Sequence, residues 1–230
     1  MTIHRFIIIL VATLLCFHRG ISFAAETAKV RLFVLSGQSN MAGLNPDDTF
    51  TPAVKAAYPK DEVIVVRYAV SGTAISQWWK DPKNPKSGGL YDVLMSQVKK
   101  AVGEKTPDTV VFIWLPGERD AKAGLSGAYT EALQGVIKRV RDDLKHPDTA
   151  VLIARISDHL NGSQHWDAVR AIHEKVAKED HRGLMVDTDD LNGTNNDLHC
   201  TKEGFLELGR RFAAKSVESL AKPVVRTAKP

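Results

Sequence analysis

The chain has 230 residues, 43% of them hydrophobic and 25% charged, a composition typical of one globular domain with a sizeable core. Its formal net charge at pH 7 is +4, and its lysines and arginines are scattered, without a basic stripe interleaved with aromatic residues. Nucleic acid is therefore not expected as a partner. The sequence has no internal repeat and no low-complexity segment.

Residues 1–24 are expected to be a signal peptide. A positive charge at Arg5 precedes an apolar run over 6–16, which is too short to span a bilayer. Ser22 and Ala24 are small residues at the two positions that a signal peptidase reads, so cleavage is expected after Ala24. The mature protein would then be secreted or periplasmic, without a membrane anchor.

Two alternatives for the N-terminus are a lipid anchor on Cys16, where the preceding Leu15 is bulkier than such a site expects, and an uncleaved membrane anchor. Signal cleavage would remove Arg5 and Arg19 and no acid, leaving a net charge of +2. Cys200 would be the only remaining cysteine, which excludes an internal disulfide and a structural zinc site of the thiolate kind.

Apolar runs and turn residues alternate along the rest of the chain. Five runs predict buried strands, at 30–36, 62–69, 109–114, 150–156 and 183–186. Apolar residues at helical spacing predict helices at about 91–102, 126–144, 166–176 and 202–220. Residues 44–61, rich in Pro, Asp and Lys, are expected to be a loop with one short helix around 52–57. This alternation predicts one α/β domain over 25–220, a three-layer α/β/α sandwich around a parallel five-stranded sheet. A basic tail, 221–230, is expected to be disordered.

Polar or glycine-bearing junctions follow the predicted strands. Ser39 comes after the first strand, Gly72 after the second and Glu118 after the third, while His199 precedes the last helix. Because the carboxyl ends of parallel strands meet at one edge of a sheet, we expect these residues to converge there.

Such a set of residues suits acyl transfer. Ester cleavage needs a hydroxyl nucleophile, a base and donors for the oxyanion. Ser39 can be the nucleophile, His199 the base, and the backbone N–H groups of Ser39 and Gly72 the oxyanion donors. A lone histidine is more often structural, and His159 and His165 lie in a loop that could also reach this edge.

Four sequence blocks, in order along the chain, make this interpretation specific. They are Gly37-Gln38-Ser39-Asn40-Met41, Ser71-Gly72-Thr73 followed by Trp78, Trp114-x-x-Gly117-Glu118-x-Asp120, and Asp197-Leu198-His199 followed by Gly204 and Leu208-Gly209-x-Arg211. Together they resemble the sialic-acid-specific acetylesterase and acetyl-xylan-esterase-like family of the SGNH hydrolase superfamily.

The resemblance implies a flavodoxin-like sheet of the SGNH hydrolase type, a catalytic centre of Ser39, His199 and Asp197, and no cofactor or metal. It implies a secreted serine esterase that removes O-acetyl groups from carbohydrate. The substrate would be an acetylated carbohydrate, and Gln38, Asn40 and Glu118 are expected to contact it.

One departure from the family pattern is Pro116, where the family has a glutamine whose side-chain amide serves as a third oxyanion donor. Proline has neither a side-chain donor nor a backbone N–H. Either Asn40 or Arg119 takes this place, or the protein is a weak catalyst. The alternative function is therefore a catalytically weak or inactive carbohydrate-binding protein on an esterase scaffold, and an esterase or lipase for non-sugar esters is a third possibility.

A second departure concerns the acid of the catalytic centre. The superfamily places aspartate three residues before the histidine, whereas here that residue is Asn196 and Asp197 stands two before. A carboxylate stabilises the imidazolium better, which favours Asp197 slightly over Asn196. A Ser–His dyad with a backbone carbonyl orienting the ring is also open. The acidic run at 187–190 is expected to be a solvated turn rather than a cation site.

Overall fold

The computed structural model describes residues 27–222, so the expected signal peptide, and all but the first two residues of the expected tail, lie outside the described residues. Five parallel strands form one sheet in the order β2-β1-β3-β4-β5. They are β1 (Val30–Gly37), β2 (Glu62–Ala69), β3 (Thr109–Leu115), β4 (Ala150–Ala154) and β5 (Gly183–Val186). The predicted strands are thus confirmed, with β4 ending two residues earlier than expected.

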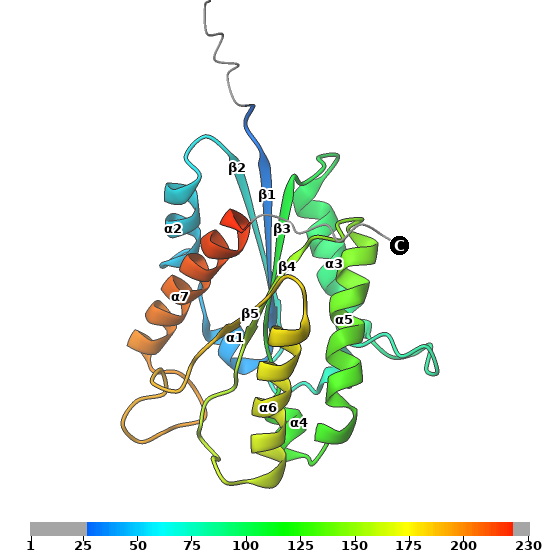
Figure 1. Cartoon of the computed structure of the whole chain (residues 1–230), viewed down its shortest axis with the longest axis vertical. Helices are drawn as coiled ribbons and strands as arrows, with labels where there is room; N and C mark the ends of the chain where they lie inside the picture. The colour runs from blue at the N-terminus through cyan, green and yellow to red at the C-terminus, as the bar shows by residue number, and fades with distance from the viewer. Residues whose placement is uncertain (1–26, 223–230) are drawn as a thin grey trace, which may run out of the picture.

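Helices cover both faces of the sheet (Figure 1). On one face lie α2 (Phe50–Ala57) and α7 (Lys202–Ala221), and on the other lie α3 (Gly89–Val102), α5 (Tyr129–Asp143) and α6 (Gln164–Glu179). The predicted three-layer α/β/α sandwich is confirmed. Among the described residues, no helix has the length and apolar content needed to cross a membrane.

Four short helical segments at the loops were not predicted as separate elements. They are α1 (Ser39–Gly43), η1 (Ile75–Gln77), α4 (Glu118–Lys122) and η2 (Ser126–Ala128). Each has at most five residues, too few for apolar residues to repeat at helical spacing. The first three directly follow the carboxyl ends of β1, β2 and β3, where they shape the edge of the sheet.

The sheet is buried on both faces because successive side chains of a strand point in opposite directions. Leu32 and Val34 of β1 join the core under α3, α5 and α6. Phe33 and Leu35 join the core under α2 and α7. This explains why the strands are continuous apolar runs rather than alternating ones.

Gly37, the last residue of β1, lies close against the neighbouring strand β3. A Cβ atom built on Gly37 would lie 2.3 Å from the carbonyl oxygen of Leu115, its register partner in β3. A side chain at position 37 would collide with β3, so only glycine fits there. The residues that follow β1 and β3 include the predicted site residues Ser39 and Glu118.

We expect Gly37→Ala to lower the free energy of unfolding by about 3 kcal/mol, because neither central strand can move away from the added methyl group. Gly127→Ala is the matched control, since a Cβ there would meet nothing within 4 Å. Urea unfolding of both variants measures the difference, and equal stabilities would contradict the close approach at Gly37.

Candidate active site

The structure brings Ser39 and His199 together at the carboxyl edge of the sheet. Ser39 is the first residue of α1, directly after β1, and His199 lies in the loop between β5 and α7. The Nε2 atom of His199 is 3.0 Å from the Oγ atom of Ser39. Ser39 is partly exposed and His199 is exposed, so a reagent in solution can reach the pair.

The two predicted oxyanion donors lie at the same edge. Gly72 is in the exposed turn after β2 with φ of +71°, and β2 pairs with β1 up to Ala69 opposite Gly37. Within residues 27–222, no hydrogen bond uses the backbone N–H of Ser39 or of Gly72. Both N–H groups are therefore free to donate to a ligand.

Asn40, the residue after Ser39, joins three segments of the chain. Its side-chain nitrogen donates to Oε1 of Glu118 at 2.8 Å and to the carbonyl of Leu198 at 3.1 Å. Its side-chain oxygen accepts from the backbone N–H of Cys200 at 3.0 Å. The helix that begins at Ser39 is thus tied both to α4 and to the loop that carries His199.

The three predicted substrate contacts face into the protein. Gln38, Asn40 and Glu118 are only 3%, 5% and 2% exposed, which leaves almost no surface for a substrate. Gln38 instead accepts from the backbone N–H of Arg119 at 3.4 Å through its side-chain oxygen. This burial does not support the expected substrate contacts, which stay a prediction; in the structure these side chains bond other parts of the protein. A short sequence block does not show whether its polar side chains are buried or exposed.

Asp197 does not touch the base in this structure. Its side chain is exposed, and no hydrogen bond among the described residues joins its carboxylate to His199; its backbone carbonyl accepts from Asn192 at 2.8 Å. The side chain of Asn196, which has φ of +50°, bonds Asn192 and the carbonyl of Asp158. Neither side chain hydrogen-bonds the imidazole among the described residues, so the choice between Asp197, Asn196 and a Ser–His dyad stays a prediction.

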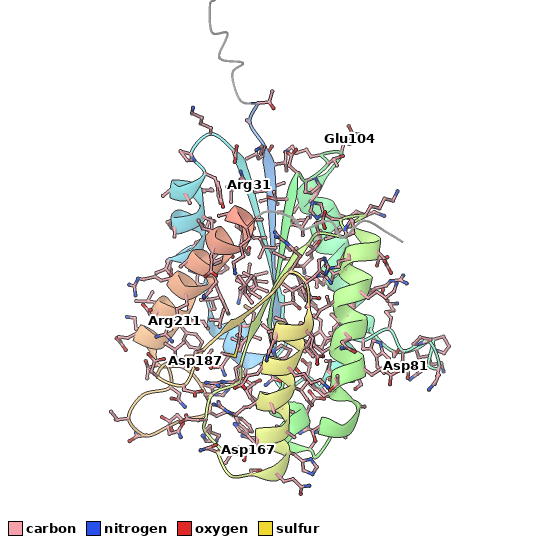
Figure 2. The ribbon with its side chains drawn as sticks, viewed as in Figure 1. Arg31, Asp81, Glu104, Asp167, Asp187 and Arg211 are labelled. Carbon is pink, nitrogen blue, oxygen red and sulfur yellow. The ribbon has the colours of Figure 1, made fainter. Side chains whose placement is uncertain are left out.

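Arginines neutralise the acidic run ahead of this loop. Asp189 accepts from Arg155 at 2.8 Å and from Arg170 at 2.7 Å. Arg211, in the middle of α7, bonds the carbonyl of Asp187, and Figure 2 shows the two residues close together beside that helix. Over the described part of the chain, no group of three or more acids, histidines or cysteines could hold a metal ion.

A buried polar network that sequence reasoning missed holds Pro116. The hydroxyl of Tyr129 donates to the Pro116 carbonyl at 2.7 Å and lies 3.3 Å from Nε1 of Trp114 and 3.0 Å from Nε2 of His173. Burial lowers the pKa of His173 to about 3, so the ring is neutral. Helical spacing predicts that Tyr129 is buried, but no pattern predicts its polar partners.

Comparison with known proteins assigns the family. The family model described as carbohydrate esterase, sialic acid-specific acetylesterase matches residues 42–218, beginning just after Ser39. The chain therefore belongs to the sialic acid-specific acetylesterase family of carbohydrate esterases. The resemblance found in the sequence blocks is thus confirmed.

Similar proteins agree with this assignment. A probable carbohydrate esterase of Arabidopsis thaliana is 25% identical over 194 residues, which cover 82% of this chain and 69% of that protein. The solved structure of the Arabidopsis protein has a TM-score of 0.65 at 21% identity, covering 83% of this chain and 98% of that one.

A second solved structure shares the fold. A carbohydrate acetylesterase of Xanthomonas citri has a TM-score of 0.61 at 17% identity, covering 87% of this chain and 58% of that one. The predicted SGNH hydrolase fold is confirmed by the parallel sheet and by neighbours of this class.

Burial perturbs the acids behind the site of this family member. It raises the pKa of Glu118 to about 7 and that of Asp120 to about 6. Asp120 accepts from the backbone N–H of Ile75 at 3.0 Å, which ties α4 to the loop after β2. Burial, together with the nearby Glu118, raises the pKa of the Cys200 thiol to about 12, so Cys200 is an unreactive packing residue.

The raised pKa of Glu118 predicts a pH-dependent stability. The folded state holds this proton more tightly than the unfolded state does, so stability should fall as pH rises from about 4.5 to about 7. The loss should reach at most about 3 kcal/mol. In urea unfolding, Glu118→Gln should flatten this decline, and an unchanged slope would contradict the buried ionisation of Glu118.

Proposed function

We propose that this protein is a serine esterase that removes O-acetyl groups from carbohydrate through a Ser39–His199 acyl-enzyme mechanism. The observation that carries the proposal is the 3.0 Å contact between His199 Nε2 and Ser39 Oγ at an exposed edge of the sheet. Membership of a carbohydrate esterase family supports the substrate class. No cofactor takes part in the proposed reaction.

In the first half of the reaction, Ser39 Oγ attacks the carbonyl carbon of the acetyl group while His199 Nε2 takes the hydroxyl proton. The backbone N–H groups of Ser39 and Gly72 donate to the oxygen that becomes negative. The intermediate then expels the sugar oxygen, which leaves as a hydroxyl with the proton from His199. Water repeats these steps on the acetyl-enzyme and releases acetate.

The open site favours a short acyl group. Three hollows elsewhere on the described residues have volumes of about 640, 860 and 690 Å³, and neither Ser39 nor His199 lines any of them. A small void behind Asn40 and Cys200 measures about 10 Å³. A long acyl chain needs an apolar pocket beside the nucleophile, so acetyl fits better than a fatty acyl group, and the lipase alternative is not favoured.

Arg119 is our candidate for the donor that Pro116 lacks. Asn40 is not available, because both of its side-chain N–H groups are already used. Arg119 is held next to the nucleophile segment through its backbone bond to Gln38. Its guanidinium is exposed and makes no hydrogen bond or ion pair with other residues of the 27–222 range.

Residues 1–24 support a secreted or periplasmic location, which remains part of the proposal. Acetylated polysaccharide outside the cell would be the corresponding substrate. Immunoblotting of cell fractions, with N-terminal sequencing of the exported protein, checks both the location and cleavage after Ala24.

We expect the protein to hydrolyse an aryl acetate and acetylated xylan, and Ser39→Ala to reduce both rates at least about 10³-fold. Circular dichroism of the variant verifies its fold. If folded wild-type protein hydrolyses neither ester, the carbohydrate-binding alternative takes the place of the esterase proposal, and binding of acetylated xylan tests it. Activity that persists in Ser39→Ala would exclude Ser39 as nucleophile.

We expect Arg119→Ala to lower kcat for the aryl acetate about 10- to 100-fold. This loss is somewhat smaller than the one that usually follows removal of an oxyanion donor. Adding Pro116→Gln to this variant should recover part of the loss by restoring a side-chain amide. Arg210→Ala, which breaks an exposed ion pair on α7, is the control. An unchanged kcat in Arg119→Ala would show that two backbone donors suffice.

A further inference from the structure

We infer that Asn40, held in place by Glu118, is a positioning residue that fixes the backbone on both sides of His199, so that the base meets Ser39 without an acid on its ring. This inference rests on the proposed function, because it concerns the same site. It gives the two buried side chains, first expected to contact substrate, a role in holding the base.

Asn40 bonds the two residues that flank His199 in the sequence. It bonds the carbonyl of the preceding residue, Leu198, and the N–H of the following residue, Cys200. With one peptide group fixed on each side, His199 keeps little freedom apart from rotation about its side-chain bonds. Since Asn40 is covalently next to Ser39, the same contacts set the distance between nucleophile and base.

Only asparagine satisfies all the groups around this position. The Leu198 carbonyl can only accept a hydrogen bond and the Cys200 N–H can only donate one, which fixes the orientation of the Asn40 amide. Aspartate would lose both donors, and glutamine would place its amide about 1.5 Å farther from the backbone. The amide's second N–H then needs an acceptor inside the protein.

Glu118 supplies that acceptor. Its Oε1 atom accepts from Asn40, while Oε2 is buried without a hydrogen-bond partner among the described residues. A buried carboxyl group with an unsatisfied oxygen is costly to stability. Asn40 provides its only side-chain hydrogen bond in the described chain, so the contact that this buried carboxyl group makes is the one that orients the Asn40 amide.

His199 depends on these backbone contacts because no hydrogen bond among the described residues holds Nδ1 of its ring. To accept the Ser39 proton at Nε2, neutral His199 must carry its own proton on Nδ1. Among residues 27–222, no acceptor bonds Nδ1, and the Asp197 carboxylate is exposed. Elsewhere in this loop Asn192 holds the Asp197 carbonyl, and the N–H of Thr201 donates to the Leu191 carbonyl at 2.9 Å. These contacts hold the second half of the loop between β5 and α7, here called the histidine loop (residues 187–201), through its backbone.

Kinetics of four variants on an aryl acetate test the inference. Asn40→Ala should lower kcat about 100-fold with KM within about threefold, because a misplaced base slows chemistry more than binding. Glu118→Ala should have a similar effect. Glu118→Gln, whose side-chain oxygen can still accept from Asn40, should keep at least a third of the wild-type kcat. Asp197→Ala should cost less than Asn40→Ala.

Asn195→Ala is the control in the same loop, since Asn195 is exposed and its side chain makes no hydrogen bond with other described residues. It should leave kcat and KM unchanged. Three results would overturn the inference: kcat within threefold of wild type in Asn40→Ala, equal losses in Glu118→Gln and Glu118→Ala, or a larger loss in Asp197→Ala than in Asn40→Ala. The second would mean that the charge of Glu118 matters, and the third that Asp197 orients the ring.

Amide hydrogen exchange gives a readout independent of catalysis. The Cys200 amide should be protected in the wild type and exchange at least about 10-fold faster in both Asn40→Ala and Glu118→Ala. The amide of Val34, in the core of β1, should not change, which also shows that each variant is folded. Unchanged protection of the Cys200 amide in Asn40→Ala would overturn the inference that Asn40 fixes the backbone beside His199. If Ser39→Ala were active, the proposed function would fail separately.

Discussion

The contact between the two central strands is the constraint on which the site depends. β1 and β3 run in register to Gly37 and Leu115, and at that point no side chain fits between them. The residues that follow are therefore held within hydrogen-bond reach of each other: Gln38 bonds Arg119, and Asn40 bonds Glu118. Two short helices, α1 and α4, follow the ends of these strands, and the position of Ser39, the proposed nucleophile, therefore depends on strand packing (Figure 1).

The histidine loop is long and has little regular structure, so its position needs other contacts. Three arginines hold its acidic start, one directly after β4 and the others on α6 and α7: Arg155 and Arg170 meet at Asp189, and Arg211 pairs with Asp190. The pairs at Asp189 are partly buried, so water screens them less than an exposed pair. Their effect here is to restrict the loop, since several charges share partners. The far end of the loop is fixed by Thr201, whose hydroxyl caps α7 by accepting from the N–H of Gly204 at 2.9 Å.

The sheet and its larger helices could be predicted from the sequence because each buried run is long enough to show a period. The meeting of Ser39 and His199 could also be predicted, since the carboxyl ends of parallel strands share one edge. The roles of Asn40 and Glu118 could not, because a polar residue in a loop block has no periodicity to show whether it faces solvent or protein. The hydrogen bonds that turn these residues inward join positions 78 and 158 residues apart in the chain.

A catalytic histidine must be both oriented and stabilised when it becomes charged, and these two requirements are separable. An aspartate on the ring meets both at once. In this protein the backbone contacts of Asn40 can meet the first requirement, while the second is left to solvent, because His199 is exposed. An exposed imidazolium is hydrated and costs less than a buried one. Among the described residues no carboxylate bonds the His199 ring, and an open site suits this arrangement: a site that enclosed its substrate would also remove the water that stabilises the charged form of the proposed base.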